Sequence, residues 1–504
     1  MTTLYRASRV HTLSSIGGGE WVLVDERHVQ RVGSGDPPAA DRTVELPGTT
    51  ILPGFIDAHV HLSGTGLALD GLDLSGAGSR EELLAAASEH LGSHPRSGRL
   101  LGIGMDESAW PNPTFPSLEE LDALSEEPIV LLRVDGYLSA ANTPALNAWG
   151  TLGLEGVERD AGGEPTGILR GQANAQMQQW YFDSLSDLEI RDAHLRATRL
   201  AASRGLTCVQ EMAIPDKRGR RDHEVLMAMR SEFPIEVIVY IADRDMPYVI
   251  GRGLSTIGGD LFLDGSIGAR TAALLEPYEG EEGRGSLAYE DDDLAEFAHN
   301  AHLAGLQVGM HVIGDAAIEQ ALRVWERVYQ SLDSRNRRHF RARRHRLEHF
   351  EMASTQAVER AAALGLAISI QPAFDATWGH EGGMYEQRLG AHRARTMNPF
   401  RTMMERGLEV GGGSDSPVTP LDPMLGIFAL ENHHDPLQRI SREEAVRLYT
   451  IGAARLAHLE KRGRLDPGAS ADFAAYETDP FSVPDVRELR PVLTVSRGRE
   501  VHSR

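Results

Sequence analysis

The stretch Ala304-Gly-Leu-Gln-Val-Gly-Met-His311 decides the fold, because it joins a helical segment to an apolar strand that ends in a polar residue. Glycine directly after a helix adopts the left-handed capping conformation at little cost. The same unit recurs as Arg204-Gly-Leu-Thr-Cys-Val-Gln-Glu211, Leu364-Gly-Leu-Ala-Ile-Ser-Ile-Gln371 and Arg406-Gly-Leu-Glu-Val-Gly-Gly-Gly-Ser-Asp415. Any one of these polar residues is an ordinary strand ending, but four in register favour the rim of a barrel. Repeated units of this kind predict a parallel α/β sheet with its active site at the carboxyl ends of the strands.

Both ends of the chain carry short strand patterns instead of this unit. Residues 20–25 alternate between apolar and polar, and residues 471–477 and 492–496 are also strand-like. Because chain termini often lie close together, we expect one small β domain built from both ends.

An insert at about residues 63–185 interrupts the repeated units. It contains an expected helix at residues 81–90, expected strands at 100–104 and 129–134, and several aromatic residues, among them Trp110. Inserts on barrel loops often form lids or substrate walls, which makes Trp110 a candidate substrate contact. Each aromatic residue fits a local core equally well.

Composition excludes several classes of protein. The 504 residues carry 51 basic and 73 acidic side chains, a net charge of −22 that disfavours nucleic-acid binding through a basic face. No apolar run is long enough to span a membrane, and no secretory signal is visible. The single cysteine, Cys208, has no partner for an internal disulfide, so we expect a cytoplasmic setting. The acidic surface is compatible with a homodimer.

His59 and His61, in Gly54-Phe-Ile-Asp-Ala-His-Val-His61, are the sharpest local signal for chemistry. Strand alternation points both side chains to one face, where they can bind one metal ion. A single His-x-His pattern is a weak indication of a metal site, because pairs of histidines also occur by chance. We interpret His433 and His434, which are adjacent in the sequence, as such a chance pair.

Three more potential ligands strengthen the metal prediction, each expected at or near a strand end: His311, His349 and Asp415. Imidazole nitrogens and a carboxylate on several strand ends are typical of Zn²⁺ or a related divalent metal, with one position left open for water.

Longer motifs resemble the metal-dependent amidohydrolase superfamily. They are Pro53-Gly-Phe-Ile-Asp-Ala-His-Val-His61, Gly413-Ser-Asp-Ser-Pro-Val418 and Gly463-Arg-Leu-Asp-Pro-Gly-Ala-Ser-Ala-Asp-Phe473. A further group, Asp264-Gly-Ser-Ile-Gly-Ala-Arg-Thr-Ala272, Glu276-Pro-Tyr278, His311-Val-Ile-Gly-Asp-Ala316, Arg346-Leu-Glu-His349 and Gln371-Pro372, resembles the "amidohydrolase 3" branch, which includes N-substituted formamide deformylases.

This resemblance, which extends to about residue 480, implies a distorted (β/α)8 TIM barrel of residues 51–454. It also implies a β-sandwich-like domain of residues 1–50 and 455–504, and hydrolysis of a C–N bond.

The resemblance also implies roles for single residues. His59 and His61 match ligands of the first strand, His311 and His349 those of the fifth and sixth, and Asp415 that of the eighth. Two positions depart from the pattern. Asp260 stands where many relatives have a lysine, four residues before Asp264, and Tyr137 stands where the branch commonly has histidine, so a substrate contact through Tyr137 is in question.

The scarcity of lysine bears on the number of metal ions. The chain has only Lys217 and Lys461, and both are expected to lie far from the fourth strand, so a carboxylated lysine cannot bridge two ions. We therefore expect one zinc ion bound by His59, His61, His311 and Asp415. A two-ion site would need a different bridging carboxylate, for which Glu211 and Asp260 are the candidates.

In the mechanism expected from this site, metal-activated water attacks an amide-type bond. Asp415 is both a ligand and a proton shuttle, and His349 polarises the carbonyl or orients another ligand. Several further residues are candidates for substrate contact, although each fits a structural role as well: Asp264 and Arg270, which could form a charge pair, and Gln371, Phe374 and Trp378 after the seventh strand.

The leading prediction is thus a hydrolase acting on a small molecule that carries an apolar or aromatic substituent. A heterocycle deaminase or a metal-assisted decarboxylase on the same fold remains an alternative. A non-catalytic small-molecule binder is a third, against which the complete ligand set argues.

Overall fold

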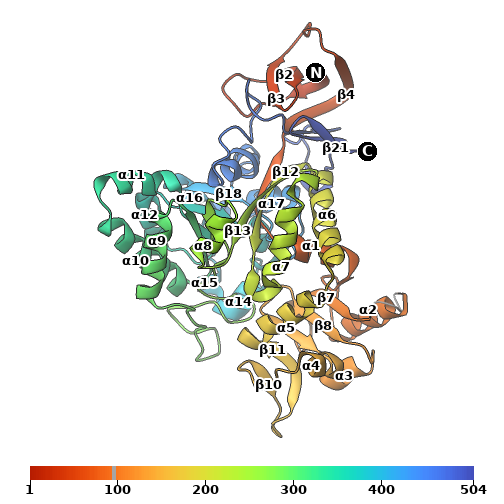
Figure 1. Cartoon of the computed structure of the whole chain (residues 1–504), viewed down its shortest axis with the longest axis vertical. Coiled ribbons are helices and arrows are strands. Elements are labelled where there is room, and N and C mark those ends of the chain that lie inside the picture. Colours follow the sequence, from red (N-terminus) through yellow and green to blue (C-terminus); the bar gives the residue numbers. More distant parts are fainter. Residues whose placement is uncertain (94–97) are drawn as a thin grey trace.

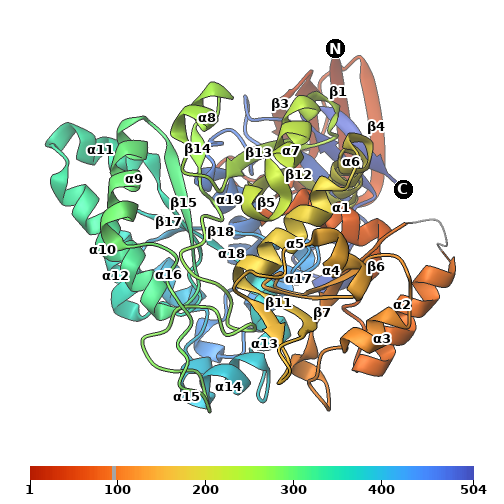
Figure 2. The same ribbon diagram turned by 60° about the horizontal axis from the view of Figure 1, so that its bottom comes forward.

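The computed structural model describes residues 1–93 and 98–504. Within them, eight parallel strands form the centre of the molecule (Figures 1 and 2). In chain order they are β5 (Phe55–Val60), β12 (Leu206–Ala213), β13 (Glu236–Ile241), β14 (Thr256–Ile257), β15 (Gln307–Val312), β16 (Arg346–His349), β17 (Ala367–Ile370) and β18 (Glu409–Gly412). The first three form one sheet and the last five a second sheet.

Hydrogen bonds join the two sheets at both edges. The Gly258 amide, just after β14, donates to the Ile241 carbonyl of β13 at 2.8 Å. The Asp415 amide, just after β18, donates to the His59 carbonyl of β5 at 2.8 Å. The eight strands therefore follow one another around a ring, a TIM-barrel-like arrangement, and the α/β class expected from the sequence is confirmed.

The four helix-to-strand units quoted from the sequence are confirmed. Four helices precede the strands in question: α6 (Asp187–Ser203), α9 (Asp291–Leu303), α12 (Thr355–Leu364) and α16 (Phe400–Glu405). The glycines between helix and strand, at positions 205, 305, 365 and 407, all have φ between 76° and 85°. These left-handed values are the ones that glycine adopts without strain.

Further helices surround the ring: α7 (Pro215–Ala228), α8 (Met246–Gly251), α10 (Asp315–Ser331), α11 (Ser334–Arg343), α17 (Pro423–Glu431) and α18 (Arg442–Arg447). The short helix α19 (Ala453–Leu456) instead contacts β5, β17 and β18, and its carbonyls accept from the buried Gln210 and Gln307 side chains. After β17 come three short helices, α13 (Pro372–Trp378), α14 (Met384–Leu389) and α15 (Ala391–Ala394).

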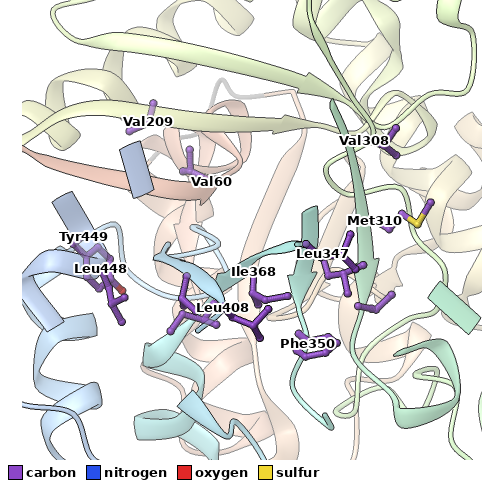
Figure 3. Close-up of a cluster of buried hydrophobic side chains, with 14 of the residues drawn as sticks. Val60, Val209, Val308, Met310, Leu347, Phe350, Ile368, Leu408, Leu448 and Tyr449 are labelled. Atoms are coloured by element: carbon purple, nitrogen blue, oxygen red, sulfur yellow. The ribbon is translucent and has the colours of Figure 1, made fainter. Parts of the chain in front are cut away.

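Strand alternation separates the apolar core from the chemistry. Val308 and Met310 of β15 belong to the main apolar cluster together with Leu347 of β16 and Ile368 of β17 (Figure 3). Since residues two apart share a face of a strand, His311 faces away from this cluster. Burying each large apolar side chain contributes about 1.5–3 kcal/mol, which holds the register of the strands. The same register then determines where His311 lies.

Strands from both ends of the chain share a seven-stranded sheet, in the order β21-β20-β19-β4-β1-β2-β3. Its members are β1 (Thr2–Val10), β2 (Gly19–Asp25), β3 (His28–Gly33), β4 (Arg42–Pro53), β19 (Phe473–Tyr476), β20 (Leu493–Ser496) and β21 (Arg499–Ser503). This sheet lies at the top of Figure 1. Since β4 leads almost directly into β5, the sheet anchors the start of the ring.

The segment between β5 and β12 forms a separate six-stranded sheet with its own helices, at the bottom of Figure 1. Its strands are β6 (Leu72–Asp73), β7 (Leu100–Met105), β8 (Ile129–Arg133), β9 (Leu138–Ala141), β10 (Val157–Arg159) and β11 (Pro165–Arg170). Its helices are α2 (Arg80–Ser93), α3 (Leu118–Asp122), α4 (Thr143–Trp149) and α5 (Gly171–Asp183). The helix that directly follows β5, α1 (Leu62–Asp70), packs against α6 of the ring. The helix expected at residues 81–90 and the strands expected at 100–104 and 129–134 are confirmed as α2, β7 and β8.

No helix among the described residues combines the length and apolar character needed to cross a bilayer.

Candidate metal centre

The carboxyl ends of the ring strands bring the predicted ligands together. His59 lies at the end of β5 and His61 just beyond it, His311 lies in β15, His349 ends β16, and Asp415 follows β18. All five are buried. Asp260, which follows β14, joins them at the centre of the group.

Two glycines carry Asp260 into the ring. Gly258 and Gly259 have φ of 78° and 75°, a conformation that residues with a side chain rarely adopt. A Cβ atom at Gly258 would lie 2.1 Å from the Gly309 carbonyl oxygen of β15. Because only glycine fits this turn, the chain can pass close to β15 and direct the Asp260 carboxylate inward.

The donor atoms form two sets that share Asp260: one with His59, His61 and Asp415, the other with His311 and His349. In the first set, Nε2 of His61 lies 3.1 Å from Asp260 Oδ2 and 3.0 Å from Asp415 Oδ1. In the second, Asp260 Oδ1 lies 3.4 Å from His311 Nδ1 and 3.5 Å from His349 Nε2. Four ligands at tetrahedral metal bonds of about 2.0–2.1 Å lie about 3.4 Å apart, so these spacings suit a divalent ion.

The inner atoms of the cluster lack hydrogen-bond partners. Within the described part of the chain, five buried atoms are unpaired there: His59 Nε2, Asp260 Oδ1, His311 Nδ1, His349 Nε2 and Asp415 Oδ1. Buried polar atoms are almost always paired, because an unpaired one loses its hydration without compensation. Five such atoms facing one another fit bound metal, which would satisfy all of them.

The outer ring nitrogen of each histidine is engaged, as metal-binding histidines require. His61 Nδ1 donates to the Met212 carbonyl at 2.8 Å, and His311 Nε2 donates to the Gly265 carbonyl at 3.2 Å. Because a carbonyl oxygen only accepts, the outer nitrogen carries the proton and the inner nitrogen directs a lone pair into the cluster. His59 Nδ1 contacts Glu348 Oε2 at 2.9 Å, and His349 Nδ1 contacts Gln371 Oε1 at 2.8 Å.

Glu348 is a positioning residue that the sequence analysis did not assign. Its carboxylate accepts from Arg346 Nε and Nη2, both at 2.8 Å, while it holds His59. Burial raises the pKa of Glu348, but the Arg346 guanidinium and His59 outweigh this effect and lower it, so Glu348 is ionised. Strand alternation places Arg346 and Glu348 on one face of β16, and this was the signal that could have identified the pair.

Two of the candidate ligands have unusual backbone conformations. His349 and Asp415 have φ of 70° and 54°, in the left-handed region that residues with a side chain seldom occupy. Such conformations cluster at functional sites, where the surrounding structure maintains them. Burial raises the pKa of Asp415, but the adjacent His59 and His61 more than reverse this, so its carboxylate is ionised.

Two cavities meet at the cluster, and both reach Tyr137, His311, His349 and Asp415. The first, which we call the cationic cavity, also reaches Asp260, Lys217 and Arg218 and has a volume of about 70 Å³. The second, the aromatic cavity, is lined by Phe374, Trp378 and Tyr385 among others and has a volume of about 40 Å³.

Several predicted substrate contacts lie at this junction. The Tyr137 hydroxyl lies 3.3 Å from His311 Nε2. The Phe374 ring lies parallel to the His349 ring, with centroids 6.1 Å apart. Trp378 lines the aromatic cavity while its Nε1 donates to Asp106 at 2.9 Å. Gln371 lies behind His349 and orients it.

Other candidates lie outside the cluster. The Glu211 carboxylate accepts from the Leu62 amide at 2.6 Å and belongs to neither ligand set. The Asp264 carboxylate accepts from three backbone amides, those of Ala273, Ile313 and Gly314, and burial raises its pKa to about 7. Both carboxylates therefore hold loops of the ring in place.

Two candidates from the loops and the insert also have structural partners. Arg270 pairs with Glu281 at 2.9 Å, so the predicted Asp264–Arg270 charge pair is wrong. Trp110 packs in the core of the insert, where its Nε1 donates to the Ala77 carbonyl at 2.7 Å, and it lines neither cavity.

The expectation that Lys217 lies far from the fourth strand is wrong. Lys217 follows β12 and Asp260 follows β14, and both line the cationic cavity, because the ring gathers the carboxyl ends of its strands at one rim. A kink in α7 at Gly219, with φ of 71°, ends the short turn that carries Lys217. Burial lowers the pKa of Lys217 to about 8.

Comparisons with known proteins agree with this geometry. Residues 42–502 match the Amidohydrolase family, which is most of the chain. The chain belongs to the amidohydrolase family. It is 29% identical to "Putative amidohydrolase YtcJ" of Bacillus subtilis (strain 168), covering 96% of both chains. It is 26% identical to the N-substituted formamide deformylase of Arthrobacter pascens, covering 96% of this chain and 93% of the other.

The fold of this amidohydrolase is also found in a solved structure. The crystal structure of an uncharacterized metal-dependent hydrolase from Pyrococcus horikoshii OT3 matches it with a TM-score of 0.78, covering 97% of this chain and 99% of the other at 24% identity. The resemblance stated from the sequence motifs is thus confirmed at the level of the family and the TIM-barrel-like fold.

Proposed function

We propose that this amidohydrolase hydrolyses an amide-type C–N bond of a small molecule at the His/Asp cluster. The observation that carries the proposal is the set of five unpaired inner atoms. The three histidines among them, His59, His311 and His349, are each fixed through the outer ring nitrogen. The name of the Arthrobacter relative, N-substituted formamide deformylase, supports a C–N bond as the target.

A divalent ion held by these residues would lower the pKa of the attacking water and would polarise the carbonyl. The protein supplies proton transfer: the ionised Asp415 carboxylate accepts a proton from the attacking water and passes it to the leaving nitrogen. His349 and Tyr137 lie where the two cavities meet, and they orient the carbonyl between them. The buried rim excludes bulk water and strengthens these interactions.

We further propose that the site would hold two zinc ions, one with His59, His61 and Asp415 and the other with His311 and His349, and that the Asp260 carboxylate would serve both sets. The single-ion prediction grouped His311 with His59, His61 and Asp415, whereas the distances group His311 with His349 and Asp260. Asp260, which is common to both sets, would stand in for the lysine derivative that the resemblance implies in many relatives. Elemental analysis of the purified protein should give nearly two metal ions per chain, and a ratio near one would favour the single-ion prediction.

The activity is tested with a substrate panel of N-formyl amines, N-acyl amines, cyclic imides and aminated heterocycles. Amine, acid, ammonia and CO₂ are assayed separately, with chelated and metal-restored protein. Release of amine and acid that depends on metal supports the proposal. Release of ammonia from the heterocycles alone, or of CO₂, would replace it with deamination or decarboxylation.

A further inference from the structure

Lys217 is a buried cation without a close hydrogen-bond acceptor or ion-pair partner among the described residues. It is only 8% exposed, and its Nζ lies 4.2 Å from the ring centroid of Tyr137 and 4.5 Å from that of Phe262. Its one hydrogen bond within the described structure is a long contact of 3.5 Å to the Gly136 carbonyl. No carboxylate of residues 1–93 or 98–504 lies within 4 Å of it, as the ion pairs show.

The Gly136 carbonyl is already saturated. Asn174 Nδ2 and Gln178 Nε2 both donate to it at 2.9 Å, which occupies its two lone pairs. Lys217 is therefore the third and most distant donor. The aromatic faces hold the ammonium in position, but its N–H groups remain largely unsatisfied, and this is costly for a buried charge.

Arg218 adds a second cation to the same cavity. Its Nη1 donates to Ser63 Oγ at 3.2 Å, its guanidinium lies 5.4 Å from the Phe182 ring centroid, and its buried Nε has no partner. Ser63 in turn donates to Asp222, so Arg218 reaches an acidic group only through a hydroxyl. Of the two cations, Lys217 therefore has the weaker hydrogen bonding.

The aromatic cavity differs in this respect. Arg133, which lines both cavities, pairs with Asp135 and Glu107, and Glu351, which lines only the aromatic cavity, accepts from the Tyr385 hydroxyl at 2.6 Å. The arginine of the aromatic cavity thus has carboxylate partners, which Lys217 and Arg218 lack within the described residues. The chain has 73 acidic side chains, yet none forms an ion pair with Lys217 or Arg218 among the described residues. Because a buried charge is costly without an opposite charge, we infer that an anionic group of the substrate pairs with these cations.

We propose that the substrate carries a carboxylate, which Lys217 Nζ binds in the cationic cavity while Arg218 adds positive charge beside it. The part between the carboxylate and the scissile bond packs on the apolar wall formed by Leu101, Ile103, Leu132 and Phe182. The other half of the amide occupies the aromatic cavity against Phe374 and Trp378. This inference rests on the proposed hydrolysis and narrows its substrates to carboxylate-bearing amides.

The two-lysine composition makes a direct binding test possible. Protein labelled with ¹³Cε-lysine gives two side-chain signals, and Lys461→Met, which changes an exposed lysine, identifies the Lys217 signal. Metal-free protein is titrated with 4-phenylbutyrate and, as the neutral comparison, with 4-phenylbutanol. The carboxylate should shift the Lys217 signal alone, and the alcohol should shift it much less. Equal shifts with both probes, or no shift with either, would overturn the proposal.

Affinity and specificity are measured on the same variants. Lys217→Met should weaken 4-phenylbutyrate binding to metal-free protein by tenfold or more in calorimetry, Lys217→Arg should restore most of it, and Lys461→Met should match the wild type. With metal restored, each active amide is paired with its carboxylate-bearing counterpart, and the ratio of the two kcat/KM values should fall at least tenfold in Lys217→Met. An unchanged ratio and affinity would refute the role of Lys217.

These outcomes separate the inference from the proposed function. Lysine-dependent carboxylate binding in a protein that hydrolyses no amide would refute amide hydrolysis and leave the anion site standing. Hydrolysis of neutral amides without any preference for carboxylates would refute the anion site and leave the hydrolase proposal standing.

Discussion

Among the described residues, the metal centre and one separate group of histidine and aspartate are compact enough to hold a metal, and they differ in one decisive respect. The first is the metal centre described above. The second consists of Asp375, His433 and His434, with Asp375 Oδ1 lying 3.3 Å from His433 Nε2 and 2.5 Å from His434 Nδ1. Residue type and distance alone do not distinguish the two groups.

Hydrogen bonding does distinguish them. In the second group, His433 Nε2 donates to the Asn398 carbonyl at 3.0 Å and its Nδ1 accepts from the Asp435 amide at 3.0 Å. His434 uses one ring nitrogen for Asp375 and the other for the Arg395 carbonyl. No ring nitrogen of this group is left for a metal, whereas His59, His311 and His349 of the metal centre leave their inner nitrogens unpaired. A metal site is thus recognised by its unsatisfied atoms rather than by proximity.

The largest effect is expected from Asp415→Asn, because the amide can neither shuttle the proton nor bind metal as strongly. Turnover should fall by about 10³-fold or more, while the thermal unfolding temperature changes little. The matched substitution in the second group, Asp375→Asn, should leave turnover within a few-fold of the wild type. Retained activity in Asp415→Asn would refute the role of Asp415 as proton shuttle.

Replacing the shared carboxylate with Asp260→Ala should reduce bound metal from nearly two ions per chain to one or fewer, because both ligand sets lose a member. Activity should fall by about 10²-fold or more. Glu211→Gln is the control, since Glu211 belongs to neither set and its bond to the Leu62 amide can persist. Loss of the second ion in Glu211→Gln instead would identify that residue as the bridge.

A smaller effect is expected from Glu348, which does not bind metal itself but contacts the outer nitrogen of His59. Glu348→Gln weakens the contact that orients His59, so metal affinity should fall by about 10–100-fold, as measured by competition with a chromogenic chelator. Glu381→Gln, at an exposed position, controls for the change of charge. Unchanged metal affinity in Glu348→Gln would show that the Arg346–Glu348 pair stabilises the interior of the ring and does not position a metal ligand.

The smallest effect is expected in the second group. His434→Gln should leave metal content unchanged and lower the free energy of unfolding by about 1 kcal/mol. Burial lowers the pKa of His434, but its bond to Asp375 outweighs this and raises it above the usual 6.5. The stabilisation is therefore complete below pH 6.5 and is lost as the pH rises through the folded-state pKa.

Urea unfolding of the wild type and His434→Gln should thus differ more at pH 6 than at pH 9. A loss of metal from His434→Gln would contradict the contrast between the two groups.

The predictions from the sequence succeeded where a local pattern carries the information. Glycine after a helix, apolar alternation and polar strand endings identified four of the ring strands, and His311 and Gln371 came with them. His59 and His61 followed from a spacing of two on a single strand. Each of these inferences needs only a few neighbouring residues, because helix capping and strand alternation are local properties of the backbone.

The predictions failed where the outcome depends on which strand ends face one another. Lys217 was judged distant because it lies in a turn, Pro215-Asp-Lys-Arg-Gly219, outside the expected fourth strand. Arg270 was given the nearby Asp264 as a possible charge partner, whereas it pairs with Glu281. Trp110 was a plausible substrate wall by residue type, but it packs inside the insert. Sequence distance is a poor guide here because ring closure joins segments that long helices and an insert separate.

The sequence by itself therefore determined the class of fold, the family and most of the candidate ligands, because these are written in local periodicity and in motifs. Only the tertiary structure decided that Asp260 is shared by two ligand sets, that Glu348 holds His59, and that Lys217 lies unpaired beside them. The physical reason is that pairing, burial and unsatisfied charge are properties of atoms in contact. In a closed ring, those atoms come from opposite parts of the chain.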